Sequence, residues 1–286
     1  MTSSLRLQFP VRRLDKPFSI TEYSYVMPNP YRAEGGALVG AYAAFQDWDM
    51  LCRFYWGGGK IDLVTKPGHM EGFSVVNDPI ALMSERLINL LFRRADVAKA
   101  KNTVAYVVDP ELVFVEGKDM ATHPDAYAQV GLITGTGTVT RSHISAQLPS
   151  DTTALCGDQA LTDELHTSLP FIDQQSNLLN ALSKLSVVDE GLFDPAGGRY
   201  TSDTGEIQLA TKEGRFHIHT LKTEAIVLAD MGSCTGKRLM LENVSGPVTV
   251  SVSAMDDKPL QTSRRILMMH LTNVLNNQMK FRDQHG

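Results

Sequence analysis

The chain has 286 residues, of which 43% are hydrophobic and 21% charged, a composition ordinary for a soluble globular protein of one to three domains. Its formal net charge of -5 gives no broad attraction to nucleic acid or to an anionic membrane surface. No apolar stretch approaches the roughly 20 residues that a membrane helix needs, so we expect neither nucleic acid nor a membrane among the partners.

A short strand is predicted at residues 17–22, PFSITE, and a loop with Pro28 and Pro30 follows it. Glu22 would then lie at the C-terminal end of this strand. Residues 32–48 carry small and apolar side chains at helical spacing, with two glycines near the start. They predict a helix that packs closely on a sheet.

The run from Met50 to Trp56 is rich in aromatic residues and stops at three glycines, which is typical of a buried parallel strand. Asn77 or Asp78 could cap a helix that begins with Pro79, and residues 79–95 continue it with one apolar face. The order strand, helix, strand, helix indicates a βαβα unit, from which parallel sheets and barrels are built.

The remaining chain divides into two parts. Residues 99–195 predict a mixed α/β segment and connector, with a strand at 103–108, a short helix near 124–130 and a helix at 173–185. Residues 196–286 predict mostly strands, at the spacing of an antiparallel β-sandwich-like domain that is truncated at its end. The predicted domains are therefore 1–98, 99–195 and 196–286.

Residues 16–56 resemble the seventh and eighth strand segments of the clan A glycoside hydrolases, whose nucleophilic Glu ends the seventh strand and whose aromatic platform often ends the eighth. Glu22 matches the nucleophile and Trp56 the platform. With residues 77–97 and the later TSDTGEI and DDKPLQTSRRILMMHLTNV segments, the chain is similar to large bacterial glycosyl-hydrolase-like proteins that append β-domains to a (β/α)8 barrel.

The resemblance implies that residues 1–98 are the last two units of such a barrel, in an α/β protein with an added β-domain. It also implies a retaining hydrolase of β-linked glycans of the galactoside or glucoside type, in which Glu22 attacks the anomeric carbon. The substrate-binding residues would be Trp56, Tyr55, Tyr23, Tyr25 and Asn29. Each has a structural alternative: loop packing for Tyr23, Tyr25 and Asn29, core packing for Tyr55 and Trp56, and a loop cap for Glu22.

The chain departs from the family because a complete barrel takes about 250 residues and only about 15 precede the matched seventh strand. The Asn-Glu pair that carries the acid/base in this clan would lie outside the chain. We therefore expect the C-terminal piece of a longer enzyme, inactive alone, whose parent could be a secreted or periplasmic bacterial protein. Sequence leaves its oligomeric state open.

Other chemistry is weakly indicated. His217 and His219 share a strand face but have no visible third ligand, and the three cysteines have no metal-binding spacing. The Gly135–Thr138 run lacks the third glycine of a dinucleotide fingerprint and predicts a turn between strands. Arg32 and Glu34 could pair with each other or line the pocket. We expect no cofactor and a carbohydrate partner.

A second hypothesis is a non-catalytic carbohydrate-binding or structural protein built on the C-terminal strands. Such binding faces usually expose several aromatic side chains, yet residues 197–286 contain no Trp and only three other aromatics, Tyr200, Phe216 and Phe281. This composition favours the enzyme hypothesis over the binding module.

Overall fold

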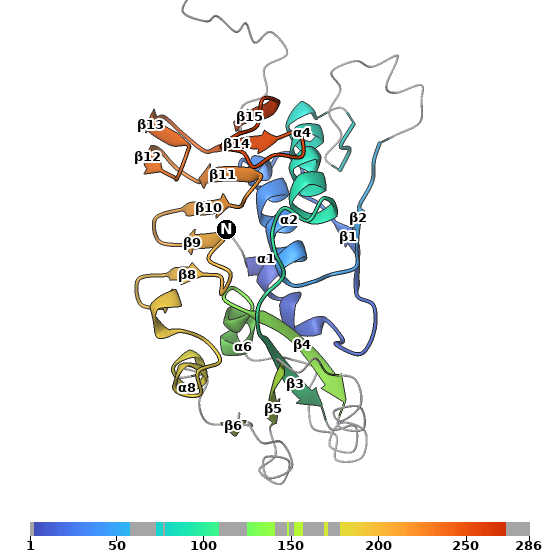
Figure 1. Cartoon of the computed structure of the whole chain (residues 1–286). Coiled ribbons are helices and arrows are strands. Elements are labelled where there is room, and N and C mark those ends of the chain that lie inside the picture. The colour runs from blue at the N-terminus through green and yellow to red at the C-terminus, as the bar shows by residue number, and fades with distance from the viewer. Residues whose placement is uncertain are drawn as a thin grey trace, which may run out of the picture.

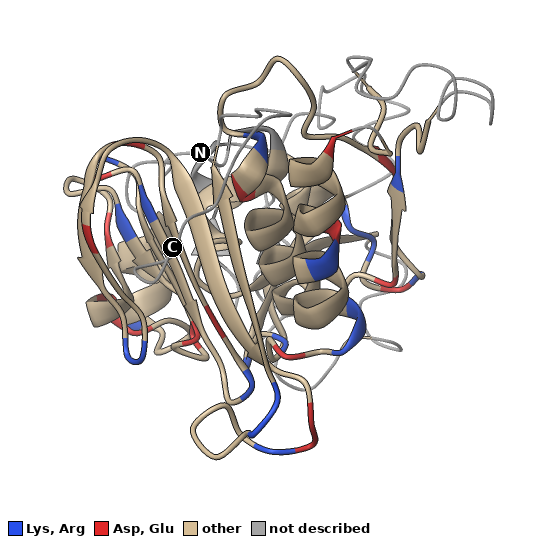
Figure 2. Cartoon of the chain, turned by 90° about the horizontal axis from the view of Figure 1, so that it is seen from above, with Lys and Arg blue, Asp and Glu red and all other residues tan. Residues whose placement is uncertain are grey.

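The computed structural model describes residues 3–57, 73–76, 78–108, 125–140, 148, 152–156, 169–170 and 178–272. Two helices, α2 and α4, lie between a large antiparallel sheet on one side and two short parallel strands on the other (Figures 1 and 2). A second, parallel sheet lies at the end of the molecule away from α4 (Figure 1). The candidate site belongs to the layer of short parallel strands.

The large sheet has seven strands in the order β15-β14-β11-β10-β9-β8-β7, and every neighbouring pair is antiparallel. Its strands are β7 (Phe193–Asp194), β8 (Arg199–Thr201), β9 (Ile207–Ala210), β10 (Arg215–His219), β11 (Thr223–Leu228), β14 (Val248–Ala254) and β15 (Ile266–Thr272). A separate two-stranded arm, β12 (Gly232–Thr235) and β13 (Met240–Val244), leaves the sheet after β11.

Strand β11 is buried along its whole length because both faces of the sheet are covered there. Ala225 and Val227 belong to the main core, which also contains α2. Ile226 and Leu228, on the opposite face, pack in a smaller cluster with side chains of the β12–β13 arm. Successive side chains of β11 point to opposite faces of the sheet, so this one strand contributes to two hydrophobic clusters.

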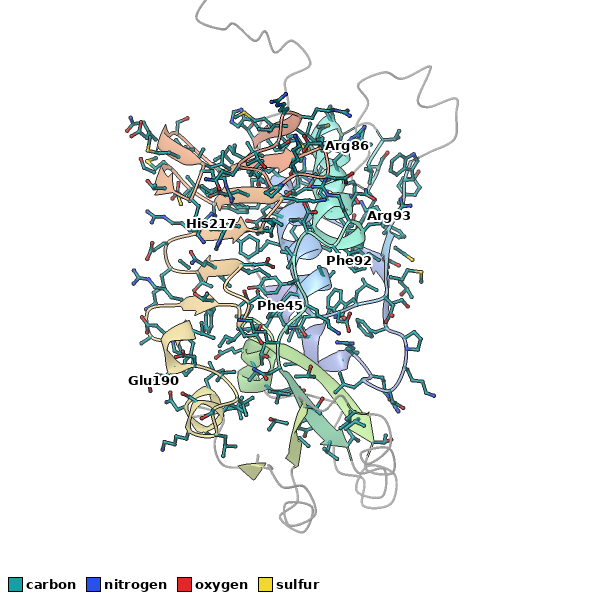
Figure 3. All side chains as sticks on the ribbon, in the orientation of Figure 1. Phe45, Arg86, Phe92, Arg93, Glu190 and His217 are labelled. Atoms are coloured by element: carbon teal, nitrogen blue, oxygen red, sulfur yellow. The ribbon has the colours of Figure 1, made fainter. Side chains whose placement is uncertain are left out.

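Helix α2 (Gly35–Phe45) has no polar face, and ten of its eleven residues are buried. Tyr42 packs on Phe216 of the large sheet, with ring centroids 5.7 Å apart. Ile20 of β1 and Leu51 of β2 pack against the same core from the other side. A helix that is apolar all round must be covered on all sides, and here two sheets and a second helix cover it (Figure 3).

Helix α4 (Pro79–Ile88) lies against α2 and continues into a π-helical turn, η3 (Asn89–Arg93). Asp78 caps its first turn by accepting a hydrogen bond from the Ile80 amide. The helices touch at Gly36, where any Cβ would collide with the backbone of Ser84, and the Gly36 amide donates to Ser84 Oγ at 2.7 Å. The glycine predicted at the helix start therefore sets the distance between the two helices.

The parallel sheet has the strand order β4-β3-β5-β6. Strand β4 therefore forms one edge of the sheet, and β3 lies between β4 and β5. Its strands and the helices around it are β3 (Thr103–Val108), α6 (Asp125–Val130), β4 (Gly135–Thr140), β5 (Thr152–Cys156), β6 (Leu169–Pro170) and α8 (Leu178–Lys184). Gln46, at the end of α2, joins this sheet to the helices: its buried amide donates to the Gly131 and Thr134 carbonyls and accepts from the Thr136 amide.

Short helices complete the described chain: α1 (Ser3–Arg6), η1 (Phe9–Val11), η2 (Arg32–Glu34) and η6 (Glu190–Leu192). Phe9 of η1 is fully buried and packs on Tyr42 and Trp48, which closes the core near the N-terminus. Among the described residues, no helix is both long and apolar enough to cross a bilayer.

The predicted fold class is wrong. The parallel strands β1 (Ser19–Tyr23) and β2 (Met50–Arg53) pair only with each other among the described residues, and no closed (β/α)8 barrel forms there. The chain is instead dominated by the seven-stranded antiparallel sheet, whose one face packs on α2 and whose other face is partly covered by the two-stranded β12–β13 arm. The barrel prediction failed because α2 buries its far side on that antiparallel sheet, where a barrel helix would face solvent.

Two local predictions also need correction. Strand β2 is parallel to β1, as its sequence context indicated, but Met50 is exposed and the other three residues are only half-buried, because β1 is its one paired neighbour in the described part of the chain. The glycines at 135 and 137 do not form a turn: they lie within β4, where Gly137 allows close approach of Leu14 and the Arg12 backbone. Asn77 and Gly58 lie outside the described residues.

The segment that leaves η3 is hydrogen-bonded to the strand ends and turns at one end of the large sheet. Arg94 donates to the Ala254 carbonyl, and Asp96 accepts from the Thr223 hydroxyl at 2.6 Å. Further on, Glu206 accepts the Ala98 amide, and one oxygen of Asp203 accepts the amides of Lys101 and Asn102. The first hundred residues are thus fixed directly to the C-terminal sheet.

Candidate active site

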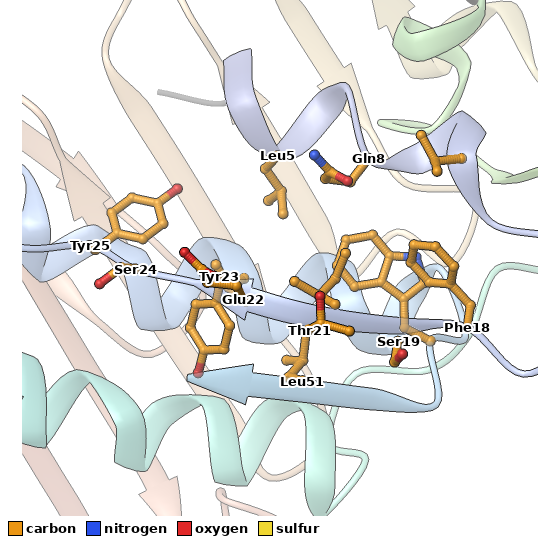
Figure 4. A pocket seen from close by; sticks show the side chains of 14 residues that line it. Leu5, Gln8, Phe18, Ser19, Thr21, Glu22, Tyr23, Ser24, Tyr25 and Leu51 are labelled. Atoms are coloured by element: carbon orange, nitrogen blue, oxygen red, sulfur yellow. The ribbon is translucent and has the colours of Figure 1, made fainter. Parts of the chain in front are cut away.

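A cavity of about 370 Å³ opens beside β1 and contains Glu22 in its lining (Figure 4). The apolar part of its lining comes from Phe18, Ile20, Val39, Trp48 and Leu51, with further residues from α1 and η1. Its polar groups come from Gln8 and from successive residues of the strand and the loop after it: Ser19, Thr21, Glu22, Tyr23, Ser24 and Tyr25. The volume is in the range of small-molecule pockets.

Glu22 is the next-to-last residue of β1, and its side chain is exposed. Among the described lining residues it is the only one with a carboxylate. The parallel pairing of β1 with β2 brings the C-terminal ends of both strands to one edge, where the Phe54 amide donates to the Tyr23 carbonyl at 3.0 Å. The strand-end position predicted for Glu22 is therefore close to the observed one.

Two polar atoms in the cavity lining are buried and lack a hydrogen-bond partner among the described residues: Ser24 Oγ and Trp48 Nε1. A buried polar group without a partner costs about 1–3 kcal/mol, which a bound ligand hydroxyl or water can recover. Trp48 is 4% exposed and packs on Phe18 at 5.4 Å between ring centroids. Trp48 was not predicted to line the site, because no local pattern links it to the residues of β1.

Tyr23 turns its hydroxyl toward helix α4, where it donates to Glu85 Oε2 at 2.8 Å. Arg53 from β2 completes this cluster: its guanidinium lies over the Tyr23 ring and 3.3 Å from Glu85 Oε1. Burial raises the pKa of Tyr23, and the nearby Glu85 carboxylate raises it further. Burial also raises the pKa of Glu85, against the opposing effects of Tyr23 and Arg53. The cluster fixes both strands of the site to α4.

Tyr25 and Asn29 lie on the loop that follows β1. The ring of Tyr25 lines the cavity and covers Gly35, where a Cβ would overlap it. Burial and the neighbouring Glu34 raise the pKa of Tyr25. The Asn29 side chain accepts the Tyr31 amide at 2.9 Å and so shapes the loop, and it is not among the residues that line the cavity.

Tyr55 and Trp56, the expected sugar platform, follow β2 but do not line this cavity. They belong instead to an exposed aromatic patch, defined here by Phe54, Tyr55, Trp56 and Phe73, with exposed fractions of 37%, 40%, 60% and 55%. Phe54 contacts Phe73 edge-on at 5.5 Å, and Tyr55 has a backbone φ of 54°, a conformation rare for a bulky residue. Phe73 was not predicted, because no pattern links it to β2.

Arg32 and Glu34 neither pair with each other nor line this cavity. Arg32 Nε lies 2.7 Å from Asp78 Oδ2, and both side chains are 2% exposed. Glu34 is also buried, and burial raises its pKa to about 7. Arg32 and Glu34 thus belong to the buried junction between the start of α2 and the start of α4, behind Tyr25.

No group of three potential metal ligands occurs among the residues that the structure describes. His217 and His219 stack with ring centroids 5.7 Å apart, but His217 is bound to Glu224 at 2.9 Å. The functional groups in the described lining of the cavity beside Glu22 are a carboxylate, hydroxyls, an amide and an indole.

Comparison of the chain with protein-family models, with curated proteins and with solved structures finds no match.

Proposed function

We propose that the chain provides the nucleophile and part of the sugar-binding surface of a retaining glycoside hydrolase that acts on β-linked glycans. The observation that carries the proposal is the position of Glu22, an exposed carboxylate at the end of β1 over a cavity of about 370 Å³. A retaining glycosidase needs one such carboxylate to attack the anomeric carbon. The proposal does not require a (β/α)8 barrel.

The cavity lining suits a sugar ring. An indole and several phenyl or phenol rings provide apolar faces, and hydroxyls of Ser19, Thr21 and Ser24 provide donors and acceptors for sugar hydroxyls. Tyr23, held by Glu85, would keep the strand end rigid while Glu22 reacts.

In the proposed reaction, a Glu22 oxygen attacks the anomeric carbon, the glycosidic bond breaks, and its electrons leave with the aglycone oxygen. A second carboxyl group about 5–5.5 Å away must protonate that oxygen and later activate water. Among the described lining residues there is no second carboxylate. We therefore place the acid/base outside them, and expect the first step to be visible only with leaving groups that need no proton.

A 2-deoxy-2-fluoro-β-glycosyl fluoride tests this step, because fluoride departs without protonation and the ester formed is slow to hydrolyse. We expect intact-mass spectrometry to show one added fluorosugar with the galactosyl or glucosyl donor, and peptide mapping to place it on Glu22. Glu22→Gln should not be labelled. Glu242→Gln, which changes an exposed strand carboxylate on β13, should be labelled like the unaltered chain. Absence of labelling, or labelling on another residue, would refute the nucleophile assignment.

A non-catalytic carbohydrate-binding role is the second candidate, and the exposed aromatic patch favours it. Aromatic rings presented to solvent at a strand end can stack on sugar faces without any carboxylate. In this case Trp56→Ala would abolish oligosaccharide binding while Glu22→Gln would leave it intact. Titration of both variants with a neutral β-linked tetrasaccharide, followed by tryptophan fluorescence, distinguishes the two functions.

A further inference from the structure

A second cavity, of about 380 Å³, lies on the face of the large sheet that points away from α2. Its floor and sides come from β8, β9 and β10, and β12 forms the wall. The inward residue Phe216 contacts α2 through Tyr42, whereas its neighbours Arg215 and His217 line the cavity. Figure 3 labels His217 on this sheet, and we call the cavity the outer groove.

Two arginines flank the outer groove. Arg199 on β8 and Arg215 on β10 are both paired in register with Ala210 of β9, so a small side chain separates them. Both bind one carboxylate: Arg199 lies 2.6 Å from Glu213 Oε1, and Arg215 lies 3.0 Å from Glu213 Oε2. Two guanidinium groups thus share a single negative charge in the lining, which leaves a net positive charge in a chain whose formal net charge is -5.

Other charged groups near the groove are already engaged. Asp194 of β7 is the register neighbour of Arg199 on β8 and lies outside the lining, and its carboxylate accepts the Gly197 amide. Glu224 is fully buried beneath His217 and accepts the amides of Lys237 and Arg238. Burial is the main cause that lowers the pKa of the neighbouring His219; Lys237, His217 and Arg238 lower it further, and Glu224 opposes them.

The remaining polar side chains of the described lining include an amide, two hydroxyls and an imidazole, beside the apolar Leu209 and Ala210. Gln208 faces His217 in register on the floor, and Thr201 and Thr235 line the sides. Tyr200 is buried, so none of the described lining residues offers an exposed aromatic ring that could stack on a nucleobase. Amide, hydroxyl and imidazole groups around a guanidinium pair fit hydroxyls around one anionic substituent. Guanidinium forks match carboxylate and sulfate oxygens in particular.

We propose that the outer groove binds an acidic saccharide, with its carboxylate or sulfate between Arg199 and Arg215 and its hydroxyls on Gln208 and Thr235. The site is separate from the cavity beside Glu22, because the large sheet and α2 lie between them. It deepens the proposed function by giving an acidic character to the glycan. A binding surface of this kind would hold the polymer while Glu22 acts on another residue of it.

Calorimetric titration of the full chain tests the proposal with three β-linked probes: triglucuronate, a sulfated galactotriose and neutral galactotriose, with inorganic sulfate alongside. We expect one acidic trisaccharide to bind at least about tenfold more tightly than the neutral one, since the anionic group makes charge-assisted hydrogen bonds. Whichever acid binds identifies the source of the anion. Equal binding of the neutral sugar, or binding of inorganic sulfate as tight as that of the saccharides, would overturn it.

The double variant Arg199→Gln/Arg215→Gln should weaken acidic saccharide binding at least about tenfold, whereas Arg265→Gln, an exposed arginine before β15, should not. Circular dichroism confirms that the double variant folds; if it does not, Arg199→Gln alone, at a largely exposed side chain, replaces it. Retained affinity refutes the site. Glu22→Gln must leave saccharide binding at the outer groove unchanged. The binding test and the labelling test can therefore fail independently of each other.

Discussion

The large antiparallel sheet and the β1–β2 layer lie on opposite sides of α2 and differ in how completely they are covered. In the sheet, β11 is buried at every residue and has a paired strand on both edges. In the thin layer, β1 and β2 pair only with each other among the described residues, and the residues around Glu22 are exposed or half-buried. The comparison suggests that the sheet provides stability and that the thin layer provides reactive groups.

The largest expected effect comes from the interface between α2 and the sheet. Phe216→Ala removes a fully buried ring that contacts Tyr42, and large-to-small changes of this kind cost about 3–5 kcal/mol. Trp56→Ala, at a 60% exposed ring of the other layer, should change stability by less than about 0.5 kcal/mol. Urea unfolding of both variants measures the contrast, and equal losses would remove the distinction between the layers.

Next in size is the buried ion pair at the start of the helices. Asp78→Asn keeps an oxygen to cap α4 but leaves the Arg32 charge without its carboxylate, so we expect a loss of about 3 kcal/mol. Glu213→Gln, which breaks the exposed pairs with Arg199 and Arg215, serves as the matched control and should leave the unfolding midpoint almost unchanged. A similar unfolding midpoint for both variants would contradict a stabilising role of the buried Arg32–Asp78 ion pair.

Glu34 predicts a pH dependence of similar or smaller size. Burial raises its folded-state pKa to about 7, above the value near 4.5 of an unfolded chain, so the folded state binds the proton more tightly. This contribution to the free energy of unfolding is fully present below about pH 4.5 and is lost as the pH rises through about 7. The total loss is at most about 3 kcal/mol. Thermal unfolding between pH 5 and pH 8 should show this loss, and Glu34→Gln should flatten it. If Glu34→Gln leaves the pH dependence of the unfolding temperature unchanged, Glu34 is not its cause.

The smallest effect is local. Glu224 holds the turn between β12 and β13 by accepting the amides of Lys237 and Arg238, and it also binds His217. Glu224→Gln should cost about 1–2 kcal/mol and speed hydrogen exchange at these two amides, while the amides of β14 stay protected. Exchange that accelerates equally in β14 would mean that the arm and the sheet unfold together.

The sequence predicted many elements because they depend on local patterns. Strand β3 has the predicted bounds, and Asp78 caps α4 as expected. The layers around α2 were not predictable in the same way. The apolar residues of α2 indicate burial but not which surfaces provide it, and the barrel resemblance supplied the wrong ones.

The candidate site shows the same limit. Glu22 was predicted because a strand ends there, and the structure places it in a cavity lining with Tyr23 and Tyr25. The contacts that orient these residues join distant positions: Tyr23 with Glu85, and Arg32 with Asp78. No pattern in a single sequence pairs residues 46 or 62 positions apart. Trp48 and the outer groove were missed for this reason.

The hydrogen bonds between residues 94–102 and the large sheet have a consequence for how the protein unfolds. Arg94 and Asp96 at the start of this segment bind Ala254 and Thr223, and its middle and end bind Glu206 and Asp203. The segment therefore cannot separate from the large sheet unless these hydrogen bonds break. A linker held in this way transmits loss of structure instead of isolating it. Heating should therefore melt the helices and the sheet in one calorimetric transition, and proteases should find residues 94–102 a poor substrate in the native protein.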